Sequence, residues 1–205
     1  MTSRVDAAVE RALDERHREA NEEVERILTA AVRVMERCSP GPPKVTDIVL
    51  EAGTCNKTFY RHFSGKDDLL LAVLRRGTAV VAAQLAAEMA GDPAPEVQVA
   101  HWVRGLLAQV ADPRLFTLCN ATLAQMSATA HDRVNDEDTM APLRDLLTEP
   151  LNRMGRPDPI RDADTVYDAT MGTLRRYIGS RRRPPAADVE HLVRFCLGGI
   201  GVTAQ

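Results

Sequence analysis

The sequence predicts an all-α protein, because apolar residues recur at helical spacing along most of the chain and no convincing strand alternation appears. Segments rich in proline and glycine separate the helical stretches. Only 4% of the 205 residues are aromatic, so the core must be built mainly from aliphatic side chains. We expect a small N-terminal helical domain followed by a larger all-helical C-terminal domain.

The first helix is predicted from apolar residues at three- and four-residue steps between Val24 and Met35. It ends near Cys38, because residues 39–43 include three prolines, which cannot continue a helix. Residues 1–23 read as an N-terminal extension with a thin apolar face, which either lengthens this helix or is loose.

Two short helices and one long helix follow. The first short helix carries apolar residues from Val45 to Ala52 and ends at Gly53, a residue suited to a turn that needs positive φ. The second runs from about Asn56 to Phe63. Residues 64–67 resemble a capping box with Asp67 in the third position, and the helix that they open reaches about residue 89.

Helical stretches of the C-terminal domain are expected at about 96–110, 114–130, 139–154, 162–180 and 186–198. The breaks between them fall at Asp112-Pro113, at Asn135-Asp136, at residues 156–159 and at the arginine- and proline-rich segment 181–185.

Charge is unevenly distributed along the chain. Residues 24–76 carry nine Lys and Arg against six acids, a net charge of +3, whereas residues 1–23 and 77–205 each have a net charge of −3. A basic segment in an acidic chain favours a confined anionic partner. Chance fluctuation remains the alternative, since +3 over this length is modest.

Targeting and cysteine patterns indicate the cytoplasm. No stretch approaches the run of about 20 apolar residues that spans a membrane, and the N-terminus lacks the apolar segment of a signal peptide. We therefore expect a cytoplasmic protein without a membrane partner. The four cysteines are widely spaced without a C-x-x-C pattern, which favours reduced thiols over disulfides or a zinc site.

Residues 45–63 place a helix, a glycine turn and a second helix within nineteen positions, the spacing of a helix-turn-helix. The first helix packs across the second, and the second is then free to enter the major groove of DNA. Side chains that can donate to phosphates or base edges face outward from the second helix: Asn56, Lys57, Thr58, Tyr60, Arg61 and His62.

The segment from Gly53 to Leu69 resembles the recognition region of the TetR family of bacterial one-component regulators. The run Thr58-Phe59-Tyr60-Arg61-His62-Phe63, followed by a lysine and acidic residues, is highly specific. Upstream, residues 26–31 resemble the start of the family's first helix, and Asp47-Ile48 and Ala52-Gly53 match its second. The resemblance covers residues 26–75.

This resemblance implies roles for individual residues. Tyr60 and His62 would hydrogen-bond phosphates, and Lys66 would contact a phosphate with help from the dipole of the following helix. Arg61 would reach a base or a phosphate. The positions facing the groove would be Asn56, Lys57 and Thr58, and Thr46 stands where several relatives place a base-contacting Arg or Lys.

The sequence departs from the family pattern at residues 49–51, where the family has a small or polar run, and at two positions that precede helices. Lys44 stands where the family usually has Thr, so it can meet a phosphate but cannot cap the helix through a side-chain oxygen. Cys55 stands where Ser or an acid is common. It is either a small residue in a tight turn or a thiol whose oxidation would disturb the contact with DNA.

For residues 76–205 the resemblance implies a ligand-binding and dimerisation domain. The last two helices would form the dimer, and small residues there would allow close packing: Ala169, Gly172, Gly179, Gly198 and Gly199. Residues of these types are more often plain core than ligand contacts, and the candidate wall residues of the pocket are Trp102, Phe116, Cys119, Met126, Tyr167 and Met171.

Three domains are thus expected: the extension 1–23, a DNA-binding domain 24–75 and a ligand-binding and dimerisation domain 76–205. The leading hypothesis is a dimeric repressor that binds a palindromic operator and is released by a small-molecule effector. The alternative is a DNA-binding accessory or structural protein without an effector. An enzyme, a cofactor and a metal are not expected, because the five histidines lack partners at catalytic or metal-ligand spacing and no catalytic motif occurs.

Overall fold

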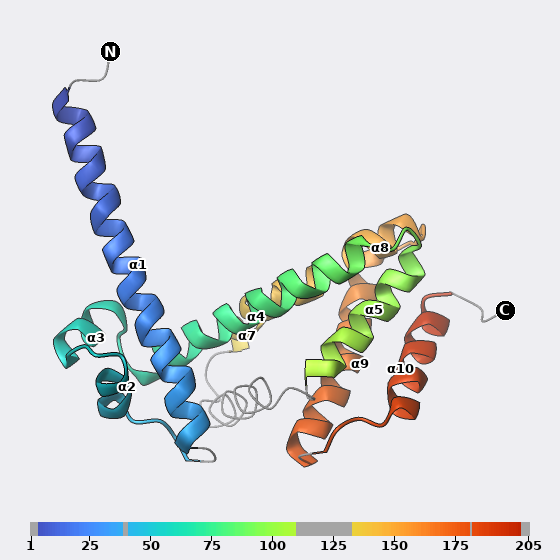
Figure 1. The fold of residues 1–205 in the computed structure, drawn as a ribbon. Coiled ribbons are helices and arrows are strands. Elements are labelled where there is room, and N and C mark those ends of the chain that lie inside the picture. The colour runs from blue at the N-terminus through green and yellow to red at the C-terminus, as the bar shows by residue number, and fades with distance from the viewer. Residues whose placement is uncertain (1–3, 39–40, 110–132, 181, 202–205) are drawn as a thin grey trace. The chain divides into compact units, whose positions relative to one another are not determined.

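The computed structural model describes residues 4–38, 41–109, 133–180 and 182–201, and within these ranges it contains helices and no strand (Figure 1). The predicted all-α class is therefore confirmed. The chain divides into two compact units, Met1–Val73 and Leu74–Gln205, and the division falls inside one long helix, α4 (Lys66–Ala90).

The first unit contains α1 (Arg4–Cys38), α2 (Val45–Glu51), α3 (Asn56–His62) and the start of α4. The extension is helical, because α1 continues without interruption from residue 4 through the expected first helix. Its side chains from Val9 to Arg18 are exposed, whereas the apolar residues from Ile27 to Met35 supply the buried face of α1.

The core of the first unit draws on all four helices. Its buried side chains are Ile27, Leu28, Ala30, Ala31, Val34 and Met35 of α1, Ile48 and Val49 of α2, Phe59 of α3, Phe63 and, on α4, Leu69, Leu70 and Val73. Arg37 Nη1 lies 2.7 Å from Glu51 Oε2 and joins the surface of α1 to the end of α2.

The second unit contains the rest of α4, then α5 (Pro95–Ala108), α7 (Arg133–Asp145), α8 (Thr148–Arg153), α9 (Pro159–Ser180) and α10 (Ala186–Gly199). Helix α5 packs against α8, α9 and α10, and its buried residues, Trp102 among them, form the centre of the core. The predicted helix at 114–130 lies outside the described residues.

The sequence placed one helix at 139–154 and a break at Asn135-Asp136, and both predictions are wrong. Helix α7 passes through residues 135 and 136, and the chain breaks instead between α7 and α8. Pro150 favours this break, because its ring clashes with the carbonyl four residues earlier, that of residue 146, and it has no N–H to donate there. As third residue of α8, Pro150 leaves no helical bond unmade.

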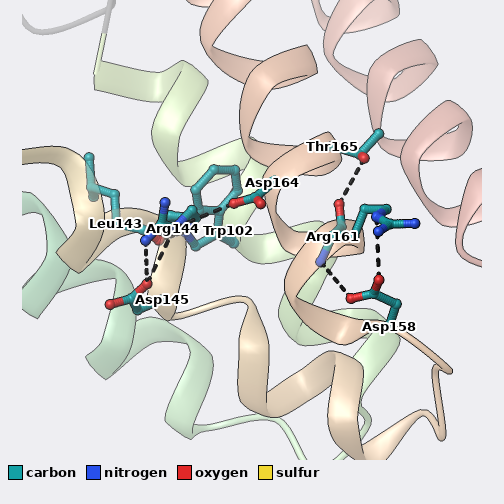
Figure 2. Close-up of polar contacts among 8 residues, drawn as sticks. All are labelled: Trp102, Leu143, Arg144, Asp145, Asp158, Arg161, Asp164 and Thr165. Atoms are coloured by element: carbon teal, nitrogen blue, oxygen red, sulfur yellow. Dashed lines mark hydrogen bonds and ion pairs between the residues drawn. The ribbon is translucent and has the colours of Figure 1, made fainter. Parts of the chain in front are cut away.

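Trp102 stabilises this break (Figure 2). Leu147 N donates to Arg144 O at 3.0 Å instead of to Leu143 O, the partner that a continuing helix would use. The released carbonyl of Leu143 accepts a hydrogen bond from Trp102 Nε1 at 2.9 Å. The buried indole N–H and the carbonyl therefore satisfy each other.

Helix α9 begins at Pro159, three residues before the predicted start. Asp158 precedes it and accepts a hydrogen bond at Oδ1 from the backbone N–H of Arg161 at 3.1 Å, as an N-cap does (Figure 2). Proline suits the first position of a helix, because its missing N–H would have no partner there.

By length and composition alone, α4 could cross a membrane, with a mean hydropathy of 1.5 over its most apolar window. The helix is a core element in both units: Leu69, Leu70 and Val73 are buried in the first unit, and Leu85 and Met89 in the second. A core helix of this kind does not indicate a membrane protein.

Candidate nucleic-acid interface

The turn between α2 and α3 is fixed by local chemistry. Gly53 has φ 61°, in the left-handed region that favours glycine. Its N–H donates to Leu50 O at 3.2 Å, and the N–H of Thr54 donates to Val49 O at 3.1 Å. These two bonds form a Schellman motif, which ends α2 and turns the chain into α3.

Phe59 anchors α3 to the rest of the first unit. Its side chain is fully buried, and its ring centroid lies 5.6 Å from that of Phe63 and 5.2 Å from that of Tyr60. Tyr60 meets Phe59 edge-on yet is 60% exposed, so one side of its ring is held while the rest reaches solvent. A buried residue at position 59 leaves positions 57 and 61 on the opposite side of the helix and position 60 on its flank. Asn56 is exposed because it is the first residue of α3.

The structure places the predicted DNA-binding residues at the surface of one unit, on α2, α3 and the two flanking segments. Six of them are exposed, namely Lys44, Thr46, Asn56, Lys57, Tyr60 and Arg61, and three are partly buried, namely Thr58, His62 and Lys66. The group offers cationic, hydroxyl and amide donors, which suit phosphates and base edges.

The departures at Lys44 and Cys55 leave two helix starts without side-chain caps. Neither Lys44 before α2 nor Cys55 before α3 makes a side-chain cap hydrogen bond. The Cys55 thiol lies instead 3.4 Å from the hydroxyl oxygen of Thr58. The hydrogen bond with the Thr58 side chain is the main cause that lowers the pKa of Cys55 below its usual value.

We predict that Cys55 reacts with iodoacetamide before Cys196, because alkylation requires the thiolate. Cys55 is exposed with a lowered pKa, whereas burial raises the pKa of Cys196 to about 11. Peptide mapping by mass spectrometry would follow both sites over time. Thr58→Val should slow the reaction at Cys55, since it removes the hydroxyl. Equal rates at the two cysteines would contradict this account.

The cap of α4 differs from the predicted capping box. The acid that closes it is Asp68 rather than Asp67: Asp68 Oδ2 accepts from Ser64 N at 2.8 Å and from Ser64 Oγ at 3.1 Å. Helix α4 begins one residue later than the predicted capping box requires. The acid that bonds back to Ser64 is therefore one position further along the chain. Lys66 is thereby set in the first turn of α4.

Glu23 of α1 is a neighbour of the recognition helix that the sequence did not indicate. Its Oε2 lies 2.9 Å from Nε2 of His62 and also pairs with Nη2 of Arg61. Hydrogen bonds from His62 and then Arg61 hold the pKa of Glu23 below its usual value. No local pattern could have found this contact, because Glu23 and His62 are 39 positions apart.

In the second unit, three of the candidate ligand-binding residues lie in or against one core. Trp102 and Met171 are buried, and the ring centroid of Tyr167 lies 6.4 Å from that of Trp102. The other three, Phe116, Cys119 and Met126, lie outside the described residues. Across the described ranges, no group of three or more His, Cys, Asp or Glu side chains could hold a metal ion.

The first unit contains a short helix, a glycine turn and a second helix with an exposed polar face, all packed on a common core. This arrangement defines a helix-turn-helix DNA-binding protein. Residues 27–73 match the family model described as bacterial regulatory proteins, tetR family. Residues 27–73 thus form a DNA-binding domain of the TetR family. A comparison with curated proteins finds no match.

Solved structures of transcriptional regulators share the fold over most of the chain. A regulator of Rhodococcus sp. Rha1 is 22% identical, with a TM-score of 0.68 and coverage of 86% of this chain and 95% of that one. FadR of Bacillus subtilis in complex with stearoyl-CoA is 15% identical (TM-score 0.65; 87% and 99% covered). RolR in complex with resorcinol is 16% identical (TM-score 0.65; 91% of each). At such identities these likenesses show the fold alone.

Proposed function

We propose that the protein is a dimeric transcriptional repressor that binds a palindromic operator through α3 and is released by a small-molecule effector. The observation that carries this proposal is the exposed polar side of α3, positioned by buried Phe59 within a TetR-family domain. Sequence would be read by Asn56, Lys57 and Arg61, and phosphates would be contacted by Tyr60 and Lys66. A regulator of this kind acts in the cytoplasm.

The proposed dimer uses the outer faces of α9 and α10. Phe195 of α10 is 65% exposed, an unusual position for a phenylalanine in an aromatic-poor protein. Gly172 of α9 and Gly198 and Gly199 of α10 are exposed, and apart from the adjoining backbone of the same helix no described atom lies within 4 Å of where a Cβ would stand. These glycines would let two helix pairs approach closely around the phenylalanine.

Phe195→Glu is expected to weaken the dimer roughly a hundredfold or more, because each copy loses the burial of a large apolar side chain and gains a charge. Size-exclusion chromatography with light scattering, over a dilution series, would measure the mass. Val80→Glu is a matched control, since Val80 is another exposed apolar residue, on α4. A Phe195→Glu protein that dimerises like the control would contradict the proposed interface.

An effector is proposed for the second unit. FadR of Bacillus subtilis and RolR were solved with stearoyl-CoA and resorcinol respectively, so the shared fold accommodates small molecules of different kinds. Here Trp102, Tyr167 and Met171 would contribute to the walls, and Phe116, Cys119 and Met126 remain expected members of the site. Binding would favour a dimer whose recognition helices no longer match half-sites one helical turn apart.

Selection of duplexes from a random-sequence library by the purified protein tests the proposal. We expect enrichment of an inverted repeat whose half-site centres are about one helical turn apart, because a two-fold dimer presents two copies of α3. Binding without enrichment of any sequence would favour the alternative, a DNA-binding accessory protein without an operator.

A further inference from the structure

The end of the recognition helix is held by an acid from another helix. Glu23 lies on α1, in the stretch that continues the exposed N-terminal extension, and its Oε2 contacts both Arg61 and His62. The His62 side chain is 13% exposed, that of Glu23 27% and that of Arg61 59%. The carboxylate is thus largely covered, while most of the guanidinium remains open to a ligand.

The contact with Glu23 restricts what His62 can offer to DNA. A neutral imidazole has one N–H donor, and a carboxylate accepts but does not donate. With Nε2 2.9 Å from Glu23 Oε2, that nitrogen carries the proton toward the carboxylate and Nδ1 is left as an acceptor. A phosphate oxygen is also an acceptor, so neutral His62 has no donor for a phosphate while Glu23 holds it.

The contact has a different consequence for Arg61. A guanidinium has five N–H donors, and the bond to Glu23 comes from Nη2, so other donors remain for a base edge such as O6 and N7 of guanine. The adjacent carboxylate offsets the cation and repels phosphates. Attraction to the DNA backbone is therefore reduced more than hydrogen bonding to uncharged base acceptors.

We propose that Glu23 is a specificity-determining residue that acts through Arg61 and His62. Its carboxylate holds the two side chains at the end of α3 and lowers the sequence-independent attraction of this end for phosphates. Preference for the operator then depends more on contacts with bases. This inference rests on the proposed function and extends it to a residue outside the helix-turn-helix.

Glu23→Gln tests the inference, because glutamine keeps the size and an acceptor oxygen but removes the charge. The probes are the duplex selected by the wild-type protein and a shuffled duplex of the same composition, each titrated over a salt series. We expect affinity for the shuffled duplex to rise roughly two- to fivefold, the worth of an exposed ion pair. The salt dependence should steepen by about one to two units per dimer, and the ratio of operator to shuffled affinity should fall.

Two variants show whether the effect belongs to this contact. Glu22→Gln removes the same charge one position away, from an exposed side chain, and should leave the affinity ratio unchanged. In an Arg61→Ala background, Glu23→Gln should change affinity for the shuffled duplex much less than in the wild type. Circular dichroism melting would confirm that all four variants, including Arg61→Ala alone, are folded like the wild type.

Each outcome is decisive. If Glu23→Gln binds both duplexes like Glu22→Gln, or weakens both equally, the inference is wrong while the proposed function stands. If the wild-type protein itself does not prefer the selected duplex, the proposed function fails and the inference falls with it. A lower affinity ratio that depends on Arg61 would establish Glu23 as a specificity residue.

Discussion

Replacing Tyr60 and Lys66 together by alanine is expected to lower affinity for every DNA duplex by roughly a hundredfold or more, since each protomer loses two hydrogen bonds to charged phosphates, each worth about 1.5–3 kcal/mol. Tyr60 is exposed at the surface of α3, and Lys66 lies in the first turn of α4. The sequence that is preferred should not change, because phosphate contacts carry no base information.

The salt dependence gives this prediction its sharpest readout. Loss of one lysine from each protomer should flatten the plot of log affinity against log salt by about two units per dimer. Arg16→Ala is a matched control, because it also removes one cation from each protomer but lies on the exposed extension of α1. If the double variant Tyr60→Ala/Lys66→Ala had the same slope of log affinity against log salt as the wild type, the proposed phosphate contacts would be wrong.

Phe59→Ala is expected to destabilise the first unit by roughly 3–5 kcal/mol, the usual cost of truncating a buried phenylalanine. That is a large part of the stability of a small domain, which is about 5–15 kcal/mol. Phe59 is fully buried and supports α3, so loss of its ring should also abolish specific DNA binding. Denaturant titration followed by far-ultraviolet circular dichroism would measure the destabilisation.

Trp102 allows the two units to be followed separately in the same experiment. It is the sole tryptophan of the chain and is buried in the second unit, so its fluorescence reports on that unit. Phe59→Ala should shift the circular dichroism transition far more than the fluorescence transition. Leu50→Ala is the control, because Leu50 is 82% exposed and its loss should change stability by less than about 0.5 kcal/mol. Equal effects of the two substitutions would contradict the assigned core.

The sequence predicted the parts of the fold that depend on short-range chemistry. Gly53 marks the turn because its positive φ is a property of one residue, and the four-residue spacing of Phe59 and Phe63 marks the buried side of α3. The exposed polar positions of α3 follow from that burial. These features are determined by residues close together in the chain, so short-range patterns in the sequence are sufficient to predict them.

Features that depend on contacts between distant segments escaped prediction. The break before α8 is favoured by Pro150, but its stabilisation by Trp102 joins residues 41 positions apart. The contact between Glu23 and His62 is similarly remote and comes from a segment that the sequence marked only as an extension. Even the nearby cap of α4 was assigned to the wrong acid, because a shift of one residue at the helix start moves the partner to Asp68.

The central claim is that α3 reads a DNA sequence. Its most direct test is a gel-shift titration of the wild-type protein against the DNA upstream of its own gene, with a salt series and an unrelated competitor. We expect the labelled duplex to shift at a protein concentration of roughly 10⁻⁸ M or below. Unlabelled duplex of the same sequence should abolish the shift as a competitor, whereas unrelated DNA should not. The claim would be contradicted if binding were weak and salt-sensitive and every competitor duplex abolished it equally. The same result would have to hold for duplexes selected from a random library.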